Sequence, residues 1–488
     1  MKKINSSRLP MIFLSFFLIM LLVLLTGCDN SAMPPGVTLD PQNPVSLRLW
    51  HYYNGPQKQA LDKMVAEFND TVGNEQGIIV EAFSHGSISD LTDQVLAAAV
   101  KKVGSEEIPE IFSAYADTVQ QVDQIGLVAD LAQYITWEEL AEYVPNYVEE
   151  GKLGTQNSFK IFPVAKSTEI MILNKTDWTP FAKTTGATLE SLSTMEGLVQ
   201  TAKAYYEWTD AKTPAPDDGK AFWGRDSMAN YFIIGCKQLG IEIFSVTDGV
   251  VTFNIDKEIL RRLWDNYYVP SINGWFGAYG RFRSDDAKTG DILALVGSSS
   301  GSSYFPDHVT ISDTESYPIE SLILPAPLFA GGEKVAVQQG AGMVVTKSDA
   351  NREYAASVFL KWLTETERNI RFSVSTGYLP VKIAANDSVK IAEIAKTLDD
   401  DGTLRKIMNS IPIAIKTIQE NELYTNQAFS HGTEARKVLE SSLSDFLAKD
   451  LEAVNTLVAS GISRPDAAKQ FATDQNFETW YGEFTIAL

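Results

Sequence analysis

The sequence contains few of the residues that build disulfides and metal sites. Among 488 residues there are two cysteines, Cys28 and Cys236, and four histidines. Two cysteines cannot form a disulfide framework, and the scattered histidines show neither helical pairing nor a Cys-x-x-Cys motif, so we expect no metal and no cofactor. Cys236 ends an apolar run, Phe232–Cys236, which predicts a buried small hydrophobe rather than a nucleophile.

Positive charge is also scarce. Lysine and arginine together number 41 against 62 aspartates and glutamates, which gives a formal net charge of −21. We find no basic stripe, and so acidic a chain repels nucleic acid and anionic lipid. Nucleic acid is therefore excluded as a partner. The charge also has an ordinary explanation, because a surface of one sign favours solubility.

The N-terminal segment predicts export. An apolar run from Met11 to Leu25, broken only by Ser15, follows three positive residues. The run is too short to span a membrane comfortably and ends in small residues, which is typical of a signal peptide. We expect residues 1–27 to be removed. The formal charge then moves from −21 to −24, because three positive residues and no negative ones leave.

The last residues of that segment, Leu25-Thr26-Gly27-Cys28, resemble a bacterial lipobox, in which the cysteine is diacylated on sulfur and becomes the new N-terminus. We expect Cys28 to carry the lipid and to hold the protein on the outer face of the cell membrane. Residues 28–44 contain four prolines and almost no apolar pattern, which predicts a stiff tether. The alternative is an ordinary signal peptide, or a membrane anchor, with a chance cysteine.

The mature chain is long enough for two or three domains, or for one fold of two lobes. Strand-like segments at Ser46–Trp50, Ile78–Phe83 and Ile108–Phe112 alternate with helical patterns, and a second such stretch opens at Leu322. The alternation predicts an α/β fold with a mostly parallel sheet. From about Ser388 onward the pattern is helical.

In such sheets, ligands bind beyond the carboxyl ends of the strands. The residues at those ends are rings and hydrogen-bonding groups suited to a polar ligand, namely Trp50, Tyr53, His85 and Tyr115. Aromatic residues are also frequent between residues 174 and 318, where most are expected to be core. Trp223 and Trp275 lie beside glycine or polar breaks, which favours loops and a ligand role for these two rings.

Several segments of the mature chain occur in a characteristic order. They are Leu49-Trp50-His51, Ala66–Asn69, Phe162–Glu169, Leu173–Lys175, Gly340–Met343 and Ser375–Pro380. Behind a lipobox-like segment, this series resembles the family 1 extracellular solute-binding proteins. That group includes the maltose-type, multiple-sugar and glycerol 3-phosphate receptors of ABC importers. The resemblance spans nearly the whole mature chain.

The resemblance implies a two-lobed periplasmic-binding-protein-like fold of type II, with a hinge between the lobes. We expect the N-terminal lobe at 45–165 and 323–370, and the C-terminal lobe at 166–322 and 371–488. The family closes its lobes around a solute, and the membrane permease recognises the closed form. The expected function is therefore a carbohydrate receptor of an ABC importer, and not an enzyme.

The residues expected to bind the solute combine these aromatics with polar groups at the first crossover and in a serine-rich turn. They are Trp50, Tyr53, His85, Tyr115, Ser167, Thr168, Glu169, Trp223, Asp226, Trp275, Ser298, Ser299, Gly340 and Tyr378. Flat rings stack on the C–H faces of sugars, and Glu169 and Asp226 can accept hydrogen bonds from sugar hydroxyls. A structural or solvated role for the two carboxylates, and hinge support by Ser167 and Thr168, are the alternatives.

The solute could also be glycerol 3-phosphate, a glycerophosphodiester or a polyamine. Glycerol 3-phosphate receptors share the Trp-His pair, a serine-rich loop and Thr-Gly-Tyr-Leu-Pro with this chain. They also carry an arginine in the C-terminal region that meets the phosphate. The loosely corresponding stretch Glu422–Asn426 has no arginine, which favours a neutral sugar.

An alternative of another class is a surface serine hydrolase that uses Ser299. The stretch Gly297–Gly301 satisfies G-x-S-x-G after an apolar strand. His308 or His431 could serve as the base and His85-Gly86 as the oxyanion loop, but their order and spacing do not match that mechanism. A serine-rich turn that meets ligand hydroxyls or an anion is the preferred interpretation.

Overall fold

The computed structural model describes residues 33–154, 158–247, 250–398 and 402–488. The predicted signal peptide and the predicted lipidation residue Cys28 lie outside the described residues. By its internal contacts the chain divides into Met1–Thr38 and Leu39–Leu488, and the helices and strands named below lie in the second unit. Within the described ranges, no helix has the length and hydropathy needed to cross a membrane.

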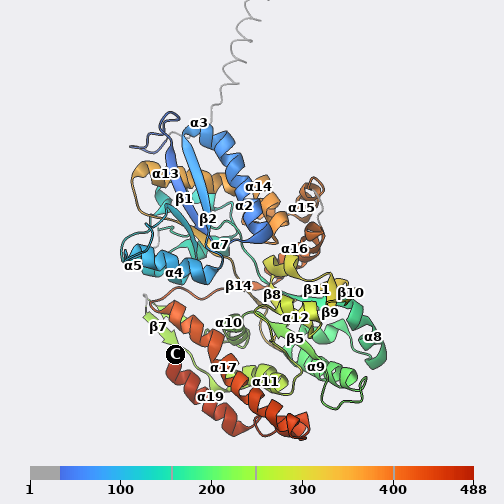
Figure 1. Ribbon diagram of the computed structural model, residues 1–488. Helices are drawn as coiled ribbons and strands as arrows, with labels where there is room; N and C mark the ends of the chain where they lie inside the picture. The colour runs from blue at the N-terminus through green and yellow to red at the C-terminus, as the bar shows by residue number, and fades with distance from the viewer. Residues whose placement is uncertain (1–32, 155–157, 248–249, 399–401) are drawn as a thin grey trace, which may run out of the picture. The chain divides into compact units, whose positions relative to one another are not determined.

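The first sheet is formed mainly by the N-terminal strands (Figure 1). Its order is β13-β3-β1-β2, with β1 at Val45–His51, β2 at Ile78–Ser84, β3 at Ile111–Ala114 and β13 at Gly342–Val345. Strand β1 is parallel to β2 and to β3, whereas β13 is antiparallel to β3. The predicted parallel pairing is therefore correct for β1, β2 and β3, and their carboxyl ends share one edge.

The second sheet has the order β11-β4-β8-β5. Its strands are β4 (Glu169–Asn174), β5 (Ala221–Arg225), β8 (Ile292–Ser298) and β11 (Ser321–Pro325). Only β5 and β8 are parallel to each other, so this sheet is mostly antiparallel and differs from the parallel arrangement predicted for the N-terminal strands. The reason is the end at which the chain enters this sheet. Strand β4 starts at Glu169, opposite Ser298, where β8 ends, so the two strands run in opposite directions.

Three two-stranded pairs accompany the sheets, and helices surround them (Figure 1). The pairs are β6 (Phe244–Thr247) with β7 (Val250–Phe253), β9 (His308–Ser312) with β10 (Glu315–Pro318), and β12 (Val335–Val337) with β14 (Glu422–Tyr424). The α-helices are α2 (Gly55–Phe68), α3 (Asn74–Gln76), α4 (Ile88–Ala99), α5 (Ala116–Gln124), α6 (Trp137–Leu140), α7 (Pro145–Gly151), α8 (Lys175–Thr185), α9 (Met195–Asp210), α10 (Met228–Gln238), α11 (Lys257–Ile272), α12 (Arg283–Thr289), α13 (Ala350–Leu363), α14 (Thr366–Thr376), α15 (Ser388–Ala395), α16 (Thr403–Glu420), α17 (Gly432–Ala459), α18 (Arg464–Ala468) and α19 (Asp474–Ala487). The π-helix η1 spans Asn69–Gly73, and the 3₁₀ turns are η2 (Leu131–Gln133), η3 (Leu189–Ser193), η4 (Ser299–Tyr304) and η5 (Ile383–Ala385).

Each sheet has its own hydrophobic core. In the first, Leu47 and Leu49 of β1 pack with Leu61 of α2 and with Phe372 of α14. In the second, helices α9, α10, α11 and α17 contribute most of the buried side chains, including many aromatic rings. Helix α17 shows how the sequence forms this core, because its buried leucines recur every four residues and make one apolar stripe. The predicted helical C-terminal part is therefore confirmed.

Three connecting segments lie side by side between the sheets, and we call them the crossing segments: 165–168, 337–341 and 377–380. Ser167 and Gln339 exchange two backbone hydrogen bonds of 2.9 Å, and Lys166 pairs with Leu379. The Lys166 Nζ donates to Glu150 Oε2 at 2.6 Å and to a carbonyl of the second segment at 2.7 Å. These contacts tie α7 to all three segments.

Candidate functional site

At the carboxyl edge of the first sheet, three of the predicted ligand residues come together. The Trp50 and His85 ring centroids are 4.5 Å apart, and the His85 N–H donates to the His51 carbonyl at 2.8 Å. Trp50 is buried beneath α4, and Tyr53 is buried against Phe372. Trp50 and Tyr53 therefore support the edge from behind, while the half-buried His85 lies at its surface.

Tyrosines from both sheets gather at this edge, and we call them the tyrosine cluster: Tyr52, Tyr53, Tyr115, Tyr304 and Tyr378. The hydroxyls of Tyr52 and Tyr378 are 3.1 Å apart, and the Tyr304 hydroxyl donates to Asn54 Oδ1 at 3.4 Å. Tyr115 follows β3 and is 40% exposed, and Tyr304 ends η4 and is 45% exposed. Burial raises the pKa of the Tyr115 and Tyr378 hydroxyls, so both remain protonated donors at neutral pH.

Two predicted residues of the crossing segments support the backbone. Ser167 is buried and uses its N–H and C=O in the pairing with Gln339. Gly340 has φ +100°, and a Cβ there would lie 2.6 Å from the Ala165 carbonyl oxygen, so only glycine fits. Both positions hold the crossing segments together in this structure, which agrees with the hinge alternative for Ser167.

Glu169 belongs to a series of polar side chains that we call the polar chain: the buried Glu169, Arg225 and Asn230, and the half-buried Arg436. Arg225 Nη2 donates to both Glu169 oxygens at 3.0 and 2.9 Å, and Asn230 Nδ2 donates to Glu169 Oε1 at 3.0 Å. Arg436 Nη2 then donates to Asn230 Oδ1 at 2.6 Å. The sequence pointed to Glu169 alone, because Arg225, Asn230 and Arg436 belong to three different elements with no local motif.

Asp117, which the sequence analysis did not select, lies against the first turn of α17. A Cβ on Gly432 would be 2.4 Å from Asp117 Oδ1, so the carboxylate rests directly on the start of this helix. Burial raises the pKa of Asp117 to about 6, although Arg436 and the Phe429 backbone oppose the shift, and Glu434 and Glu150 add to it. The positive end of α17 and Arg436 both favour the charged form here.

We expect Asp117 to make stability depend on pH. The folded-state pKa of about 6 exceeds the ordinary aspartate pKa of 3.8, so between these two pH values the folded protein holds a proton that the unfolded chain releases. Stability therefore falls as the pH rises through 6. At pH 7.5, Asp117→Asn should be more stable than the parent protein by about 2–3 kcal/mol.

Urea unfolding at pH 4 and pH 7.5 measures this difference. The exposed Asp70→Asn is the control and should change nothing at either pH. A parent protein and an Asp117→Asn variant with the same pH dependence would contradict the expectation.

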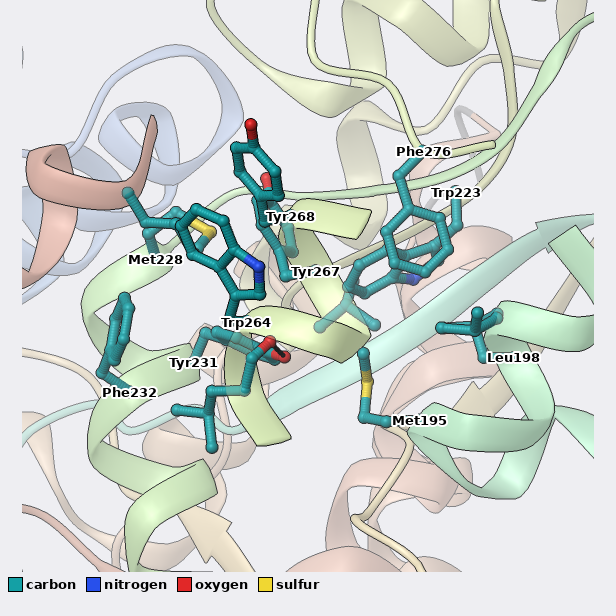
Figure 2. Close-up of a cluster of buried hydrophobic side chains, with 14 of the residues drawn as sticks. Met195, Leu198, Trp223, Met228, Tyr231, Phe232, Trp264, Tyr267, Tyr268 and Phe276 are labelled. Atoms are coloured by element: carbon teal, nitrogen blue, oxygen red, sulfur yellow. Dashed lines mark hydrogen bonds between the residues drawn. The ribbon is translucent and has the colours of Figure 1, made fainter. Parts of the chain in front are cut away.

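The structure places two predicted aromatic residues away from the tyrosine cluster. Trp223 is 0% exposed in the second core, with its ring 4.7 Å from that of Phe276 (Figure 2). Trp275 is half-buried, with Lys203 Nζ 5.7 Å from its ring centroid. In this structure Trp223 therefore has no free face for a solute.

The serine-rich turn lies at the edge of the second sheet. Ser299 is fully buried, its N–H donates to the Thr168 carbonyl at 2.8 Å, and its Oγ has no hydrogen-bond partner among the described residues. No described histidine therefore activates Ser299. Ser298 is half-buried and caps η4. Asp226 is exposed at the end of β5, and its Oδ1 accepts from the Arg283 N–H at 3.0 Å.

The described residues offer no grouping of three or more histidines, cysteines or carboxylates able to hold a metal ion. Cys236 is buried as a free thiol, and burial raises its pKa to about 12. A thiol with so high a pKa is a poor nucleophile, which agrees with the prediction of a buried hydrophobe.

Solved structures share this fold. The cyclic α-maltosyl-1,6-maltose binding protein of Arthrobacter globiformis has a TM-score of 0.60 and 20% identity, over 90% of this chain and 100% of that one. The GacH receptor of Streptomyces glaucescens has a TM-score of 0.62 and 14% identity, over 90% of this chain and 98% of that one. UgpB of Mycobacterium tuberculosis, in complex with glycerophosphocholine, has a TM-score of 0.64 and 13% identity, over 91% of this chain and 99% of that one. These likenesses confirm the predicted two-lobed periplasmic-binding-protein fold.

A search of curated protein sequences found no match. A family model described as bacterial extracellular solute-binding protein matches residues 63–397, which is more than half of the chain. Membership implies an exported protein that binds a solute and is not an enzyme, as the sequence predicted. The chain belongs to the family of bacterial extracellular solute-binding proteins.

Proposed function

We propose that this protein is a lipid-anchored receptor that captures a carbohydrate between two lobes and presents it to the permease of an ABC importer. The tyrosine cluster is the observation that carries the proposal. It offers two exposed rings from different sheets, Tyr115 and Tyr304, together with protonated hydroxyl donors. Rings that stack on sugar C–H faces, with a few placed polar groups, form the chemistry that a neutral saccharide requires.

The proposed lobes follow the two cores. Strand β11 pairs with β4 in the second sheet, so we move the second crossing from residue 323 to about Gln339, where the chain meets Ser167. We move the third crossing from residue 370 to the third crossing segment, 377–380, because Phe372 packs in the first core and Leu379 packs against β4 of the second sheet. Cys28 then carries the lipid, and residues 28–44 are the tether.

The proposed solute site consists of Tyr52, Tyr115, Tyr378, His85 and Asp117 on one side, with Tyr304, Asp226, Ser298 and the polar chain on the other. Trp50, Tyr53, Ser167 and Gly340 then act as supports. Their loss would alter affinity by moving other residues.

Replacing Tyr115 with alanine should lower sugar affinity about tenfold, equivalent to about 1.4 kcal/mol of binding free energy. The ring is 40% exposed, so its removal leaves the fold largely intact. Isothermal titration calorimetry measures the affinity, and thermal unfolding checks the fold. Tyr481→Ala, on the distant α19, is the matched control and should bind like the parent. Equal affinities for Tyr115→Ala and the parent would remove Tyr115 from the site.

A glycerophosphodiester is the second candidate solute, and Arg436 favours it. The sequence argument against a phosphate was the lack of arginine in Glu422–Asn426, but Arg436 reaches the polar chain from the next helix. Its guanidinium donates to the neutral Asn230 amide, and its charge also acts on the Asp117 carboxylate, so an anionic group bound here would share this arginine with Asp117. UgpB of Mycobacterium tuberculosis is a structural neighbour in complex with such a compound.

The solute class is tested with the soluble protein that starts after Cys28. Intrinsic tryptophan fluorescence is titrated with mono- and oligosaccharides, glycerol 3-phosphate and glycerophosphocholine. Saturable binding of a sugar, lowered by Tyr115→Ala, supports the carbohydrate receptor. A response to the phosphates alone, abolished by Arg436→Gln, replaces sugar with glycerophosphodiester. No fluorescence response to any compound of the panel contradicts both solute classes.

A further inference from the structure

A separate cavity of about 410 Å³ lies beside the second sheet. Its walls come from the start of β4, the end of β11 with the loop after it, α10, β12 and the end of α16. None of its lining residues comes from residues 39–154, which hold Tyr52, Tyr115, His85 and Asp117. The cavity is therefore distinct from the proposed solute site, although Glu169, Arg225 and Asn230 form a wall common to both.

Most of the cavity wall is apolar. The side chains that make it so are Leu192, Met195, Ile234, Leu324, Phe329 and Val335. A volume of about 410 Å³ with such walls falls in the range of small-molecule sites, which combine an apolar body with a few polar groups. The walls therefore suit a ring or a short aliphatic body.

One polar group in the wall lacks a partner. Thr168 is 0% exposed, lines the cavity, and its Oγ1 has no hydrogen-bond partner among the described residues. A buried hydroxyl without a partner is costly, so a ligand group that bonds to it gains the full benefit. Thr168 was expected to bind ligand or to support the hinge, and the structure places it in the wall of this second cavity.

The buried charged groups of the cavity wall, Glu169 and Arg225, are satisfied by each other, whereas Glu190, Lys334, Lys416 and Glu420 line it as exposed side chains. Glu169 and Arg225 form an ion pair, and Lys416 is paired with Glu420. Gln238 donates to the Val335 carbonyl at 3.0 Å and accepts from the Phe329 N–H at 3.0 Å. A charged ligand would therefore lack a counter-ion inside, and the remaining hydroxyl of Thr168 calls for a neutral molecule with one hydrogen-bonding group.

We propose that this cavity is a second small-molecule site, which takes a neutral compound with an apolar ring or short chain and a single hydrogen-bonding end at Thr168. The site touches the chain where it enters the second sheet, at Thr168 and Glu169, and in β12, Val335 to Val337, which leads into the second crossing segment. A bound molecule therefore packs against the backbone that leads into the crossing segments. The proposal is independent of which solute the tyrosine cluster binds.

Phenol and toluene are the probes that test the proposal, because they share a ring and differ by one hydroxyl. Calorimetry on the soluble protein should detect saturable binding of both, with phenol tighter. Thr168→Val removes the hydroxyl at nearly constant volume and should lower phenol affinity three- to tenfold while toluene is unchanged. Ile234→Trp fills the cavity and should abolish binding of both.

Two controls make the test specific. Thr201→Val also removes a buried hydroxyl, but Thr201 donates to the Gly197 carbonyl and does not line the cavity, so phenol affinity should be unchanged. Tyr115→Ala should also bind phenol like the parent. Absence of saturable binding in the parent overturns the proposal, as does loss of phenol affinity in Tyr115→Ala or an unchanged phenol affinity in Thr168→Val.

Discussion

Replacing Glu150 with glutamine is expected to destabilise the protein by about 3–5 kcal/mol, because it leaves a buried lysine charge without its counter-ion. The side chains of Lys166 and Glu150 are 2% and 8% exposed, and Nζ lies 2.6 Å from Oε2. Glu150 also accepts from Gln338, so the change disturbs two of the crossing segments together.

Urea unfolding of the soluble protein measures the free energy of unfolding. Glu149→Gln is the matched control, since Glu149 is the preceding residue and pairs with Lys152 while its side chain is 72% exposed. The control should cost less than about 1 kcal/mol. If the two variants lose similar stability, the buried pair is not what fixes α7 to the crossing segments.

The second large effect concerns Trp223, whose replacement by alanine should cost about 3–5 kcal/mol of stability. The indole is enclosed by Phe276 and Tyr267, with ring centroids 4.7 and 6.4 Å away (Figure 2). Truncation removes a fully buried ring and leaves a cavity that the surrounding strand and helices cannot fill.

Trp275→Ala is the comparison for this variant, because its ring is only half-buried and should cost less than Trp223. Chemical unfolding gives the two free energies, and the solute titration is repeated on both proteins. A Trp223→Ala protein of normal stability that has lost solute affinity would falsify the assignment of this ring to the core.

The misplacement of Trp223 in the sequence prediction has a physical cause. Gly224 suggested a loop, but it lies within β5, where a Cβ would be 2.4 Å from the Gly277 carbonyl oxygen. The glycine is needed for the close approach of another segment and not for a turn. A single sequence does not distinguish these two uses of glycine, because the partner segment is distant along the chain.

The edge of the first sheet was predictable because it depends on local sequence patterns, namely the alternation of buried and exposed residues along each strand. Alternating residues in β1 and β2 and the turn after each strand place Trp50 and His85 at the same edge. Arg436 was not predictable in this way. Its approach to Asn230 depends on how the buried stripe of α17 packs on α10, which is a tertiary property. The strand directions of the second sheet were not predictable for the same reason, because they follow from where the chain crosses between the sheets.

Helix α17 begins beneath Asp117 and continues for 28 residues through the second core, which makes it a rod of about 42 Å. A rod held at one end amplifies a small rotation there into a larger displacement at the other. A tilt of about 10° at the Asp117 contact moves the far end by about 7 Å. A spectroscopic label near Ser460, paired with one on the first sheet, therefore reports lobe motion far from the solute, where the label does not interfere with binding.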